Sequence, residues 1–326
     1  DSPMRKMFVG LVPLIVAAGL LWQWQFRLPP VAPALSGPQE PVPQAGRDGA
    51  AVDQTSVRLA TFNIQVFGVA KLKRTAAMSV LSQIVRRFDV VAVQEVRAKD
   101  QSVVPRFVSL INANGSSYAH VLGPRLGRSS SKEQYAYIYN RERIELLKNS
   151  VYTIHDPRDY LHREPLVARF RVRGPPVHRA LTFTLINIHT DPDEVVQEIN
   201  VLDNVFDAVR RDASREDDVI MLGDFNADEK HYGELGRMPG LKWAIAGQNT
   251  NTRMTRAYDN ILFDGRATSE FTGRSGVLNL MREFRLSQDQ ALVVSDHMPV
   301  WAEFTGTEDV PAVTSGGESA AAGKRV

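Results

Sequence analysis

Short apolar runs that end in polar residues recur along this chain. Val219–Leu222 is a continuous apolar run, followed at once by Gly223 and by the acidic and amide residues of Asp224–Asp228. A run this short and this apolar predicts a strand that is buried on both faces. Open layered α/β folds often build their sites just past the ends of such strands. The segment therefore predicts a buried strand with polar side chains placed at its end.

The same arrangement occurs twice around a helical pattern. Val57–Ile64 and Asp89–Glu95 predict strands on either side of Leu72–Phe88, whose apolar residues recur at helical spacing. A predicted strand over Leu181–Ile188 leads through a second apolar helical face to Val219–Leu222. Two strand–helix–strand units that face each other predict a sandwich flanked by helices. Further strands are predicted over Tyr135–Tyr139, Leu166–Val172, Tyr258–Phe263 and Pro299–Phe304.

Composition divides the chain into four parts. Residues 1–27 carry basic residues before the uncharged run Met7–Trp22, a pattern typical of a signal peptide or an N-terminal membrane anchor. Residues 28–56 are rich in Pro, Ala and Gly and predict an extended linker. The globular domain is expected over residues 57–304, and a disordered tail over 305–326. We expect the domain outside the cytoplasm, membrane-anchored by the N-terminus, or secreted if that segment is cleaved.

Charge balance and the absence of cysteine narrow the function classes. The chain has 39 basic and 37 acidic residues, so any nucleic-acid surface must be a local patch. It has no cysteine, which excludes disulfides, thiolate metal sites and cysteine nucleophiles. The sequence contains no Gly-rich nucleotide loop and no Ser in a nucleophile-elbow context.

Polar side chains collect at the predicted strand ends. They are Asn63, Glu95, His189, Asp224, Asn226, Asp259, Asp296 and His297. The carboxylates suit a hard, oxygen-seeking cation such as Mg²⁺, whereas a zinc cage would need thiols or more histidines. Two histidines beside surplus carboxylates allow one imidazole to act as an oriented base and the other to bind an oxyanion. The set predicts metal-assisted hydrolysis by an activated water, with phosphorus the best-matched centre.

Motifs in chain order carry a family resemblance. TFNIQVFG, VVAVQEVR, INIHTDPDEVVQEIN, IMLGDFNAD, AYDNILF and VSDHMPV resemble the endonuclease/exonuclease/phosphatase superfamily, and most closely its deoxyribonuclease I group. GDFNAD and SDHMPV are shared across the superfamily, whereas NIQVFG, LGRSSSKEQY and HREP point to deoxyribonuclease I. The resemblance covers essentially all of residues 57–304. It implies a four-layer α/β sandwich, two packed mixed sheets flanked by helices, and metal-dependent phosphodiester hydrolysis.

The resemblance also implies a metal site. Glu95 matches the principal ligand, with Asn63 and Asp296 beside it. Mg²⁺ is the expected ion and Mn²⁺ the alternative. The family's Thr-rich calcium loop is kept only in part, with Thr250 and Thr252, and this leaves a role for Ca²⁺ open.

Catalytic roles follow from the same resemblance. His297, paired with Asp259, matches the base that activates water. His189, paired with Glu133, matches the second histidine, which serves the phosphate or the leaving oxygen. The residues that orient the nucleophile and hold the scissile phosphate are matched by Asp224 and Asn226.

DNA is the substrate that the resemblance implies, without an obligate protein partner. Arginine suits such contacts because its planar fork grips phosphate oxygens. Two departures from the family, Ser131 in place of an aromatic residue and Gln65 in place of an arginine, predict weaker duplex binding and an altered cleavage preference. The residues that match DNA contacts are Arg97, Arg163, Arg128 in the minor-groove loop, and Tyr258.

Other functions fit parts of the same pattern. A sphingomyelinase-like phosphodiesterase or phosphatase of this fold, acting on lipid or small-molecule phosphates, suits a membrane anchor. An inactive binding module that keeps the fold predicts losses among the catalytic positions, and none is lost. Arg97, Arg163 and the LGRSSSKE loop favour DNA over lipid.

Overall fold

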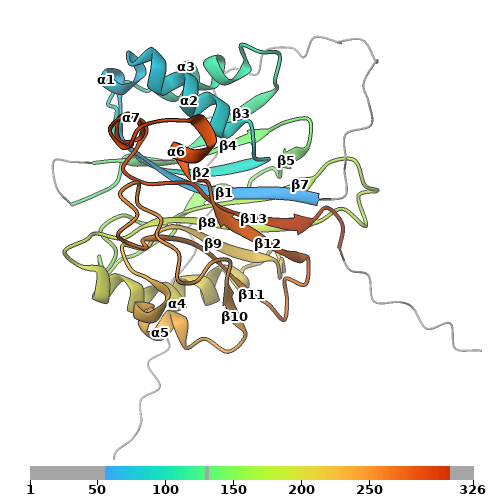
Figure 1. Ribbon diagram of the computed structural model, residues 1–326. Coiled ribbons are helices and arrows are strands. Elements are labelled where there is room, and N and C mark those ends of the chain that lie inside the picture. Colours follow the sequence, from blue (N-terminus) through green and yellow to red (C-terminus); the bar gives the residue numbers. More distant parts are fainter. Residues whose placement is uncertain (1–55, 129–131, 309–326) are drawn as a thin grey trace, which may run out of the picture.

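Two β-sheets pack face to face in the computed structural model, which describes residues 56–128 and 132–308 (Figure 1). The first sheet contains, in spatial order, β12 (Phe271–Val277), β13 (Val300–Thr305), β1 (Ser56–Phe67), β2 (Val90–Val96), β4 (Gln134–Asn140) and β3 (Tyr118–Leu122). The second contains β10 (Leu241–Trp243), β11 (Asp259–Asp264), β9 (Val219–Asp224), β8 (Thr182–His189), β7 (Leu166–Val172) and β5 (Ile144–Leu146), with β6 (Tyr152–Thr153) paired to β7.

Helices cover the outer face of each sheet (Figure 1). The first sheet packs against α1 (Val69–Leu72), α2 (Thr75–Val85), α3 (Val103–Asn112), α6 (Leu280–Phe284) and α7 (Gln288–Val294). The second packs against α4 (Val195–Arg210) and α5 (Gly233–Gly236), next to the short 3₁₀ turn η1 (Glu229–His231). Helix, sheet, sheet and helix layers make up the four-layer α/β sandwich predicted from the sequence.

The continuous apolar runs arise because each central strand is buried on both faces. In β2, Val90 and Ala92 pack between the two sheets, whereas Val91 and Val93 face the helices. In β9, Ile220 and Leu222 point to the other sheet, and the residues that alternate with them pack against α4. Successive side chains of a strand point to opposite faces, so both faces must be apolar.

Strand direction brings the polar strand ends to one edge. β1 pairs in parallel with β2, and β8 in parallel with β9, so the carboxyl ends of these four strands lie together. β4, β11 and β13 run antiparallel to their neighbours, and their first residues therefore lie at the same edge. Gly223 lets β8 and β9 approach there, since a Cβ on it would lie 2.0 Å from the carbonyl oxygen of Ile188.

Some elements differ from those predicted. The helix expected over Leu72–Phe88 is split into α1 and α2, and β1 continues past Ile64 to Phe67 through an irregular register. The sequence analysis did not identify α3, whose Pro105 obscures its pattern, or the short strands at the sheet edges. Short edge strands carry few apolar residues, and their pairing depends on neighbours distant in sequence.

The chain termini are only partly described. The predicted anchor over residues 1–27, and all of the predicted linker except residue 56, lie outside the described residues. Within residues 56–128 and 132–308, no helix is long and apolar enough to span a bilayer. The domain continues past the predicted end at residue 304, because Leu181 donates to the carbonyl oxygen of Gly306 and Thr182 donates to the Glu308 side chain.

Candidate active site

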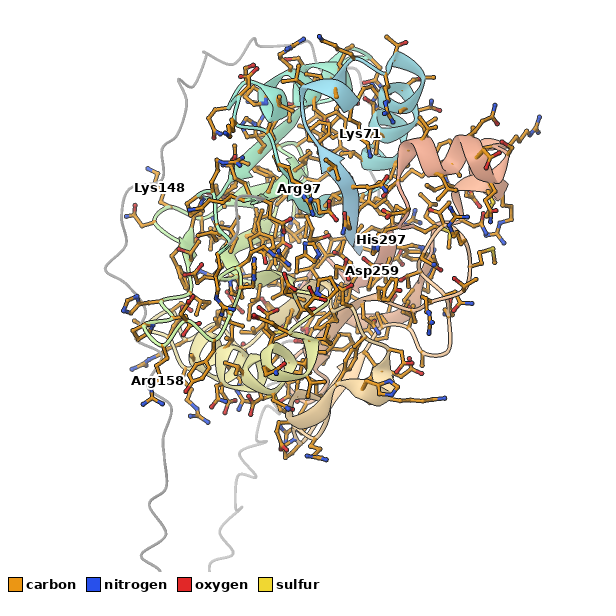
Figure 2. The ribbon with its side chains drawn as sticks, turned by 90° about the vertical axis from the view of Figure 1, so that its left-hand side faces the viewer. Lys71, Arg97, Lys148, Arg158, Asp259 and His297 are labelled. Carbon is orange, nitrogen blue, oxygen red and sulfur yellow. The ribbon has the colours of Figure 1, made fainter. Side chains whose placement is uncertain are left out.

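The polar strand ends form one cluster at a single edge of the sandwich. His297 lies just before β13, and the adjoining Asp259 begins β11 (Figure 2). Asn63 lies near the end of β1, whereas His189 and Asp224 are the last residues of β8 and β9. All five side chains are buried, so the cluster is a recess of charged and polar groups rather than an exposed surface.

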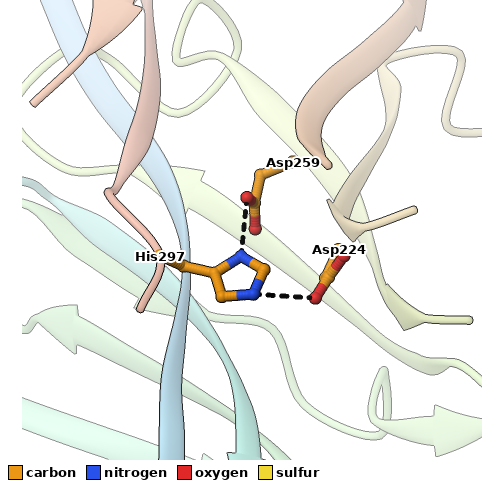
Figure 3. Close-up of side chains that lie close together, drawn as sticks. All are labelled: Asp224, Asp259 and His297. Atoms are coloured by element: carbon orange, nitrogen blue, oxygen red, sulfur yellow. Dashed lines mark hydrogen bonds and ion pairs between the residues drawn. The ribbon is translucent and has the colours of Figure 1, made fainter. Parts of the chain in front are cut away.

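His297 is held between two carboxylates (Figure 3). Its Nδ1 lies 2.9 Å from Oδ2 of Asp259, and its Nε2 lies 3.6 Å from Oδ2 of Asp224. The Tyr258 ring packs at 37° to the imidazole, with ring centroids 5.7 Å apart. These contacts fix the imidazole plane and leave Nε2 as the atom directed into the centre of the cluster.

The charges around His297 favour its protonated form. Burial alone would lower the pKa of His297, but the carboxylates of Asp259 and Asp224 outweigh it and raise the pKa to about 10. Burial raises the pKa of Asp259 above its ordinary value, while the charge of His297 opposes that rise. We take Asp259 as the ionised partner of His297, because Thr250 also donates a hydrogen bond, of 2.6 Å, to Oδ2 of Asp259.

His189 forms a second pair of the same design. Its Nδ1 lies 2.6 Å from Oε1 of Glu133, and its Nε2 lies 3.5 Å from Oδ2 of Asp224. Burial lowers the pKa of His189, yet the charge and hydrogen bond of Glu133 outweigh it and raise the pKa above its ordinary value. Glu133 is itself buried, and its pKa is lowered because the His189 and Arg163 charges overcome the effect of burial.

Asp224 and two amides complete the centre of the cluster. The Asn63 amide donates to Asp224 Oδ2 at 3.0 Å and to Glu95 Oε1 at 3.1 Å. The backbone of Asn226 donates to the other oxygen of Asp224 at 2.9 Å, and its side chain donates to the Thr190 carbonyl at 2.8 Å. Asp224 is therefore fixed in orientation, as a residue that positions a nucleophile must be.

The predicted metal ligands lie beside this centre. Glu95 has a left-handed backbone, φ 60°, where the β2 ladder shifts register between Val93 and Val96. Such irregularities re-aim side chains and are frequent next to active sites. Within the described residues, one buried oxygen of Asp296, Oδ1, has no hydrogen-bond partner. A carboxylate from β2, an amide from β1 and this unpartnered oxygen form an all-oxygen donor set that suits Mg²⁺ or Mn²⁺.

A second arrangement of possible ligand atoms is a poorer metal site. Among the described residues, Asp224, Asp259 and His297 also bring ligand atoms within 4.8 Å of one another. Both ring nitrogens of His297 face carboxylates, however, and the raised pKa keeps protons on them. A protonated imidazole cannot ligate a metal. Glu95, Asn63 and Asp296 remain the better set.

A family model supports what the geometry indicates. The model for the endonuclease/exonuclease/phosphatase family matches residues 60–297. The chain belongs to this family. The match contains every residue of the cluster, so the buried histidine–carboxylate pairs lie within the part shared with the endonuclease/exonuclease/phosphatase family.

Relatives in this family are similar over most of the chain. Deoxyribonuclease gamma of Rattus norvegicus is 32% identical over 264 residues, covering 75% of this chain and 83% of that protein. Deoxyribonuclease-1-like 1 of Homo sapiens is 34% identical over 258 residues, covering 76% and 83%. Deoxyribonuclease-1-like 2 of Mus musculus is 35% identical over 264 residues, covering 77% and 92%.

Several solved structures share the fold. D. rerio TDP2 complexed with a single-strand DNA product has a TM-score of 0.55 at 16% identity, over 76% of this chain and 98% of that one. The human Nocturnin catalytic domain has a TM-score of 0.51 at 14% identity, over 77% and 93%. Identities this low support the sandwich architecture alone.

The predicted DNA-contact arginines differ in their surroundings. Arg97 is 34% exposed and lies 3.2 Å from Glu95 at the mouth of the cluster. Arg163 is only 6% exposed and bonds Glu133 at 3.1 Å, and its buried Nη2 has no hydrogen-bond partner in the described part of the chain. Arg128 bonds Glu194 and Asp159 at the surface, next to residues 129–131, which include Ser131 and lie outside the described residues.

Several residues that hold the cluster together were not predicted as site residues. Thr250 and Thr252 are fully buried, and Thr252 donates to the carbonyls of Ser295 and His297. The sequence resemblance matched these two threonines to part of a calcium-binding loop. In the structure Thr250 bonds Asp259, and Thr252 bonds the backbone of Ser295 and His297. Their position just before AYD was the signal available in the sequence.

A buried lysine joins two of the segments that carry site residues. Nζ of Lys71 donates to the carbonyls of Ile64 at 2.7 Å and Val294 at 3.0 Å, next to Asn63 and close to Asp296 (Figure 2). Burial is the main cause that lowers the pKa of Lys71 to about 8. Sequence alone gave no sign of this role, because Lys71 follows no motif of its own.

Proposed function

We propose that this chain is a divalent-metal-dependent endonuclease that hydrolyses the phosphodiester bonds of DNA. The observation that carries the proposal is the pair of buried histidines, each backed by its own carboxylate, with both Nε2 atoms directed at Asp224. One histidine can remove a proton while the other supplies one, as hydrolysis at phosphorus requires. The similarity to proteins named deoxyribonucleases supports DNA as the substrate.

His297 acts as the general base in this proposal. Its Nε2 accepts a proton from the attacking water, while Nδ1 donates to Asp259 and the charge that forms on the imidazole is balanced there. Asp224 orients the water and Asn226 holds the scissile phosphate. The new bond joins the water oxygen to phosphorus, and the bond from phosphorus to the 3′ oxygen breaks, which leaves a 5′-phosphate end.

His189 acts on the other side of the phosphate. The raised pKa keeps a proton on the imidazole, which can bind a phosphate oxygen or protonate the leaving 3′ oxygen. Glu133 holds the ring in this orientation, and Arg163 donates to the backbone carbonyl of His189. The proposed reaction therefore starts with His189 protonated and with His297 neutral, once a bound cation offsets the carboxylates that raise the pKa of His297.

Mg²⁺ is the proposed ion, held by Glu95, Asn63 and Asp296, and Mn²⁺ can take its place. When bound, the cation polarises the phosphate and offsets the carboxylates that keep a proton on His297. Asp296 directly precedes the base His297 in sequence, so ligand and base share one short segment. That segment is fixed by Thr252, whose backbone donates to the Asp296 carbonyl at 2.7 Å.

Nicking of a supercoiled plasmid tests the proposal. The purified full chain should nick it with Mg²⁺ or Mn²⁺ and not with EDTA, and His297→Ala should abolish nicking. His178→Ala is the matched control, because His178 is exposed in the loop before β8, at the far end of the sandwich. An intact plasmid, combined with hydrolysis of sphingomyelin or an inositol phosphate, would contradict the DNA assignment and favour the lipid phosphodiesterase.

We also propose that residues 1–27 anchor the chain to a membrane, with the catalytic domain outside the cytoplasm, or direct its secretion. The uncharged run Met7–Trp22 behind Arg5 and Lys6 supports this. Fractionation of cells that express the full chain tests it. The chain should pellet with membranes or enter the medium, and replacing Leu14 and Ile15 by aspartate should release it into the soluble cell fraction. An unaltered distribution would contradict the proposal.

A further inference from the structure

A second group of carboxylates lies at the opposite end of the sandwich, where β1 begins and β13 ends (right-hand side of Figure 1). Asp218 precedes β9, Glu270 precedes β12 and Glu308 follows β13. Carboxylate oxygens of these three residues lie within 4.8 Å of one another. β9 separates Asp218 from Asp224, a distance of roughly 20 Å at the usual rise of a strand. This group therefore shares nothing with the active site.

Burial makes this group of carboxylates costly. Asp218 is 2% exposed, and its Oδ1 makes no hydrogen bond within the described residues. Burial, followed by the charge of Glu270, raises the pKa of Asp218 to about 9. Glu308 and Glu216 add to the repulsion. Arg169 lowers the pKa of the neighbouring Glu216, but burial outweighs it and raises that pKa. Buried carboxylates are normally paired with cations or coordinate metals.

A hydroxyl group with no partner points to the same place. Thr268 is 2% exposed, and its Oγ1 makes no hydrogen bond of ordinary geometry in the described part of the chain. The hydroxyl nevertheless lies close enough to Asp218 to lower the pKa of that carboxyl. Buried polar atoms without partners are rare in native proteins, and a bound ion is one explanation for them. Here a hydroxyl and a carboxylate oxygen lie close together, and neither makes a hydrogen bond of ordinary geometry within the described residues.

The spacing suits a calcium ion. A single point can lie within roughly 2.8 Å of all three oxygens, close to the usual Ca²⁺–oxygen distances of about 2.3–2.6 Å. The donors are carboxylate oxygens on separate segments, and Ca²⁺ accepts such an irregular set more readily than Mg²⁺, which demands near-ideal octahedral geometry. Neither imidazole nor thiolate belongs to the group, so the donor set does not match zinc.

We propose that Asp218, Glu270 and Glu308 bind a Ca²⁺ ion, with the Thr268 hydroxyl as a further ligand. The ion joins the start of β9 in the second sheet to the start of β12 and the end of β13 in the first. It acts as a structural cross-link between the sheets and takes no part in catalysis. Glu308 already accepts hydrogen bonds from Thr182 in β8, so the ion also secures the C-terminal segment against the second sheet.

Thermal unfolding of the full chain in Ca²⁺ or in EDTA tests this site. Ca²⁺ should raise Tm by several degrees in the wild type and equally in Glu95→Gln, which impairs the catalytic metal site. Asp218→Asn and Glu308→Gln should lose the Ca²⁺ shift. In EDTA, Asp218→Asn should melt at or above the wild-type temperature, because it replaces a carboxyl group that burial and the neighbouring carboxylates disfavour. Glu308→Gln keeps an acceptor for the hydrogen bond from Thr182. It therefore tests the site even if Asp218→Asn does not fold.

The number of ions bound gives a second measure. Equilibrium dialysis with radioactive Ca²⁺ should find one ion fewer per chain in Glu308→Gln than in the wild type, with plasmid nicking in Mg²⁺ unchanged. A Ca²⁺ shift in Tm that persists in both variants, or no Ca²⁺ shift in the wild type, would overturn the proposal. Neither outcome bears on the nuclease assignment, because nicking is measured separately.

Discussion

The Nε2 atoms of His189 and His297 face the same oxygen of Asp224, at distances of 3.5 Å and 3.6 Å. Each histidine is held from behind by a different buried carboxylate, Glu133 or Asp259. The two imidazoles come from strands of different sheets, so the packing of one sheet on the other sets their separation. The space in front of Asp224 is the place where a phosphate and an attacking water can meet both rings.

Replacing either histidine should remove most activity without unfolding the chain. His297→Ala and His189→Ala are each expected to lower kcat by about 10²- to 10⁴-fold, the usual contribution of a positioned acid or base. Because both rings act in one transition state, the double variant should lose less than the product of the two single losses. Plasmid-nicking rates and Tm of the three variants check this. Fully multiplicative losses would indicate that the histidines act independently.

The gathering of the polar residues at one edge of the sandwich could be predicted, because it follows from the directions of the strands. Apolar runs marked the strands, and the polar residues after them, such as Glu95 and Asp224, fell together once the strands were parallel. The motif resemblance assigned partners to the histidines, and the structure places Glu133 and Asp259 beside them. These features depend on local sequence and on a family pattern.

Supporting contacts could not be predicted, since they join segments that are distant in sequence. The Lys71 side chain donates to the backbone carbonyl of Val294. The Gln94 side chain donates to the side-chain oxygen of Asn187, across the two sheets, at 2.6 Å. Neither bond leaves a periodic or spaced signal in the chain. Arg163 is a related case: its position in HREP indicated a DNA contact, but only the fold reveals that it is buried against Glu133.

Thr250 is expected to position the catalytic pair. Its hydroxyl donates to Asp259 Oδ2 and accepts from the backbone amides of Tyr258 and Asp259 at 2.9 Å and 3.1 Å. Thr250→Val keeps the shape but leaves those amides without an acceptor, which should cost about 1–3 kcal/mol of unfolding free energy. It should also lower kcat about tenfold and shift the pH profile of kcat, since Asp259 loses a donor that lowers its pKa.

Thr250→Ser is the matched control for that change, because it keeps the hydroxyl and loses only a methyl group. It should restore most of kcat and the wild-type pH profile. If Thr250→Val lowers stability while kcat and the pH profile stay at wild-type values, the role of Thr250 is structural alone.

Glu133→Gln should alter the pH dependence of the reaction. The carboxylate of Glu133 raises the pKa of His189 against the opposing effect of burial. Without that charge burial prevails, the pKa of His189 falls, and the imidazole loses its proton at lower pH. Because the proposed reaction needs a protonated His189, the alkaline limb of kcat/KM should move to lower pH, and activity at pH 8 should fall more than at pH 6.

A series of kcat/KM values between pH 5 and 9 measures this shift. Glu145→Gln is the matched control, since Glu145 pairs with Arg171 on β5 and β7, away from the cluster. Its profile should overlay that of the wild type. An alkaline limb in Glu133→Gln that stays in place, or moves to higher pH, would contradict the assignment of His189 as a proton donor.

Substitutions of Arg97 and of Arg163 should change the salt dependence of kcat/KM in different ways. Arg97 is partly exposed at the mouth of the cluster, where it can meet a DNA phosphate. Arg97→Ala should raise KM and reduce the salt slope of log(kcat/KM) by about one released counterion, whereas Arg97→Lys should keep the slope.

Arg163 is buried against Glu133, so Arg163→Ala leaves that carboxylate underpaired. It should lower kcat and Tm and leave the salt slope near the wild-type value. Initial rates between 50 and 200 mM NaCl separate the two cases. A reduced slope in Arg163→Ala, with Tm unchanged, would instead make Arg163 a direct phosphate contact through its unpartnered Nη2.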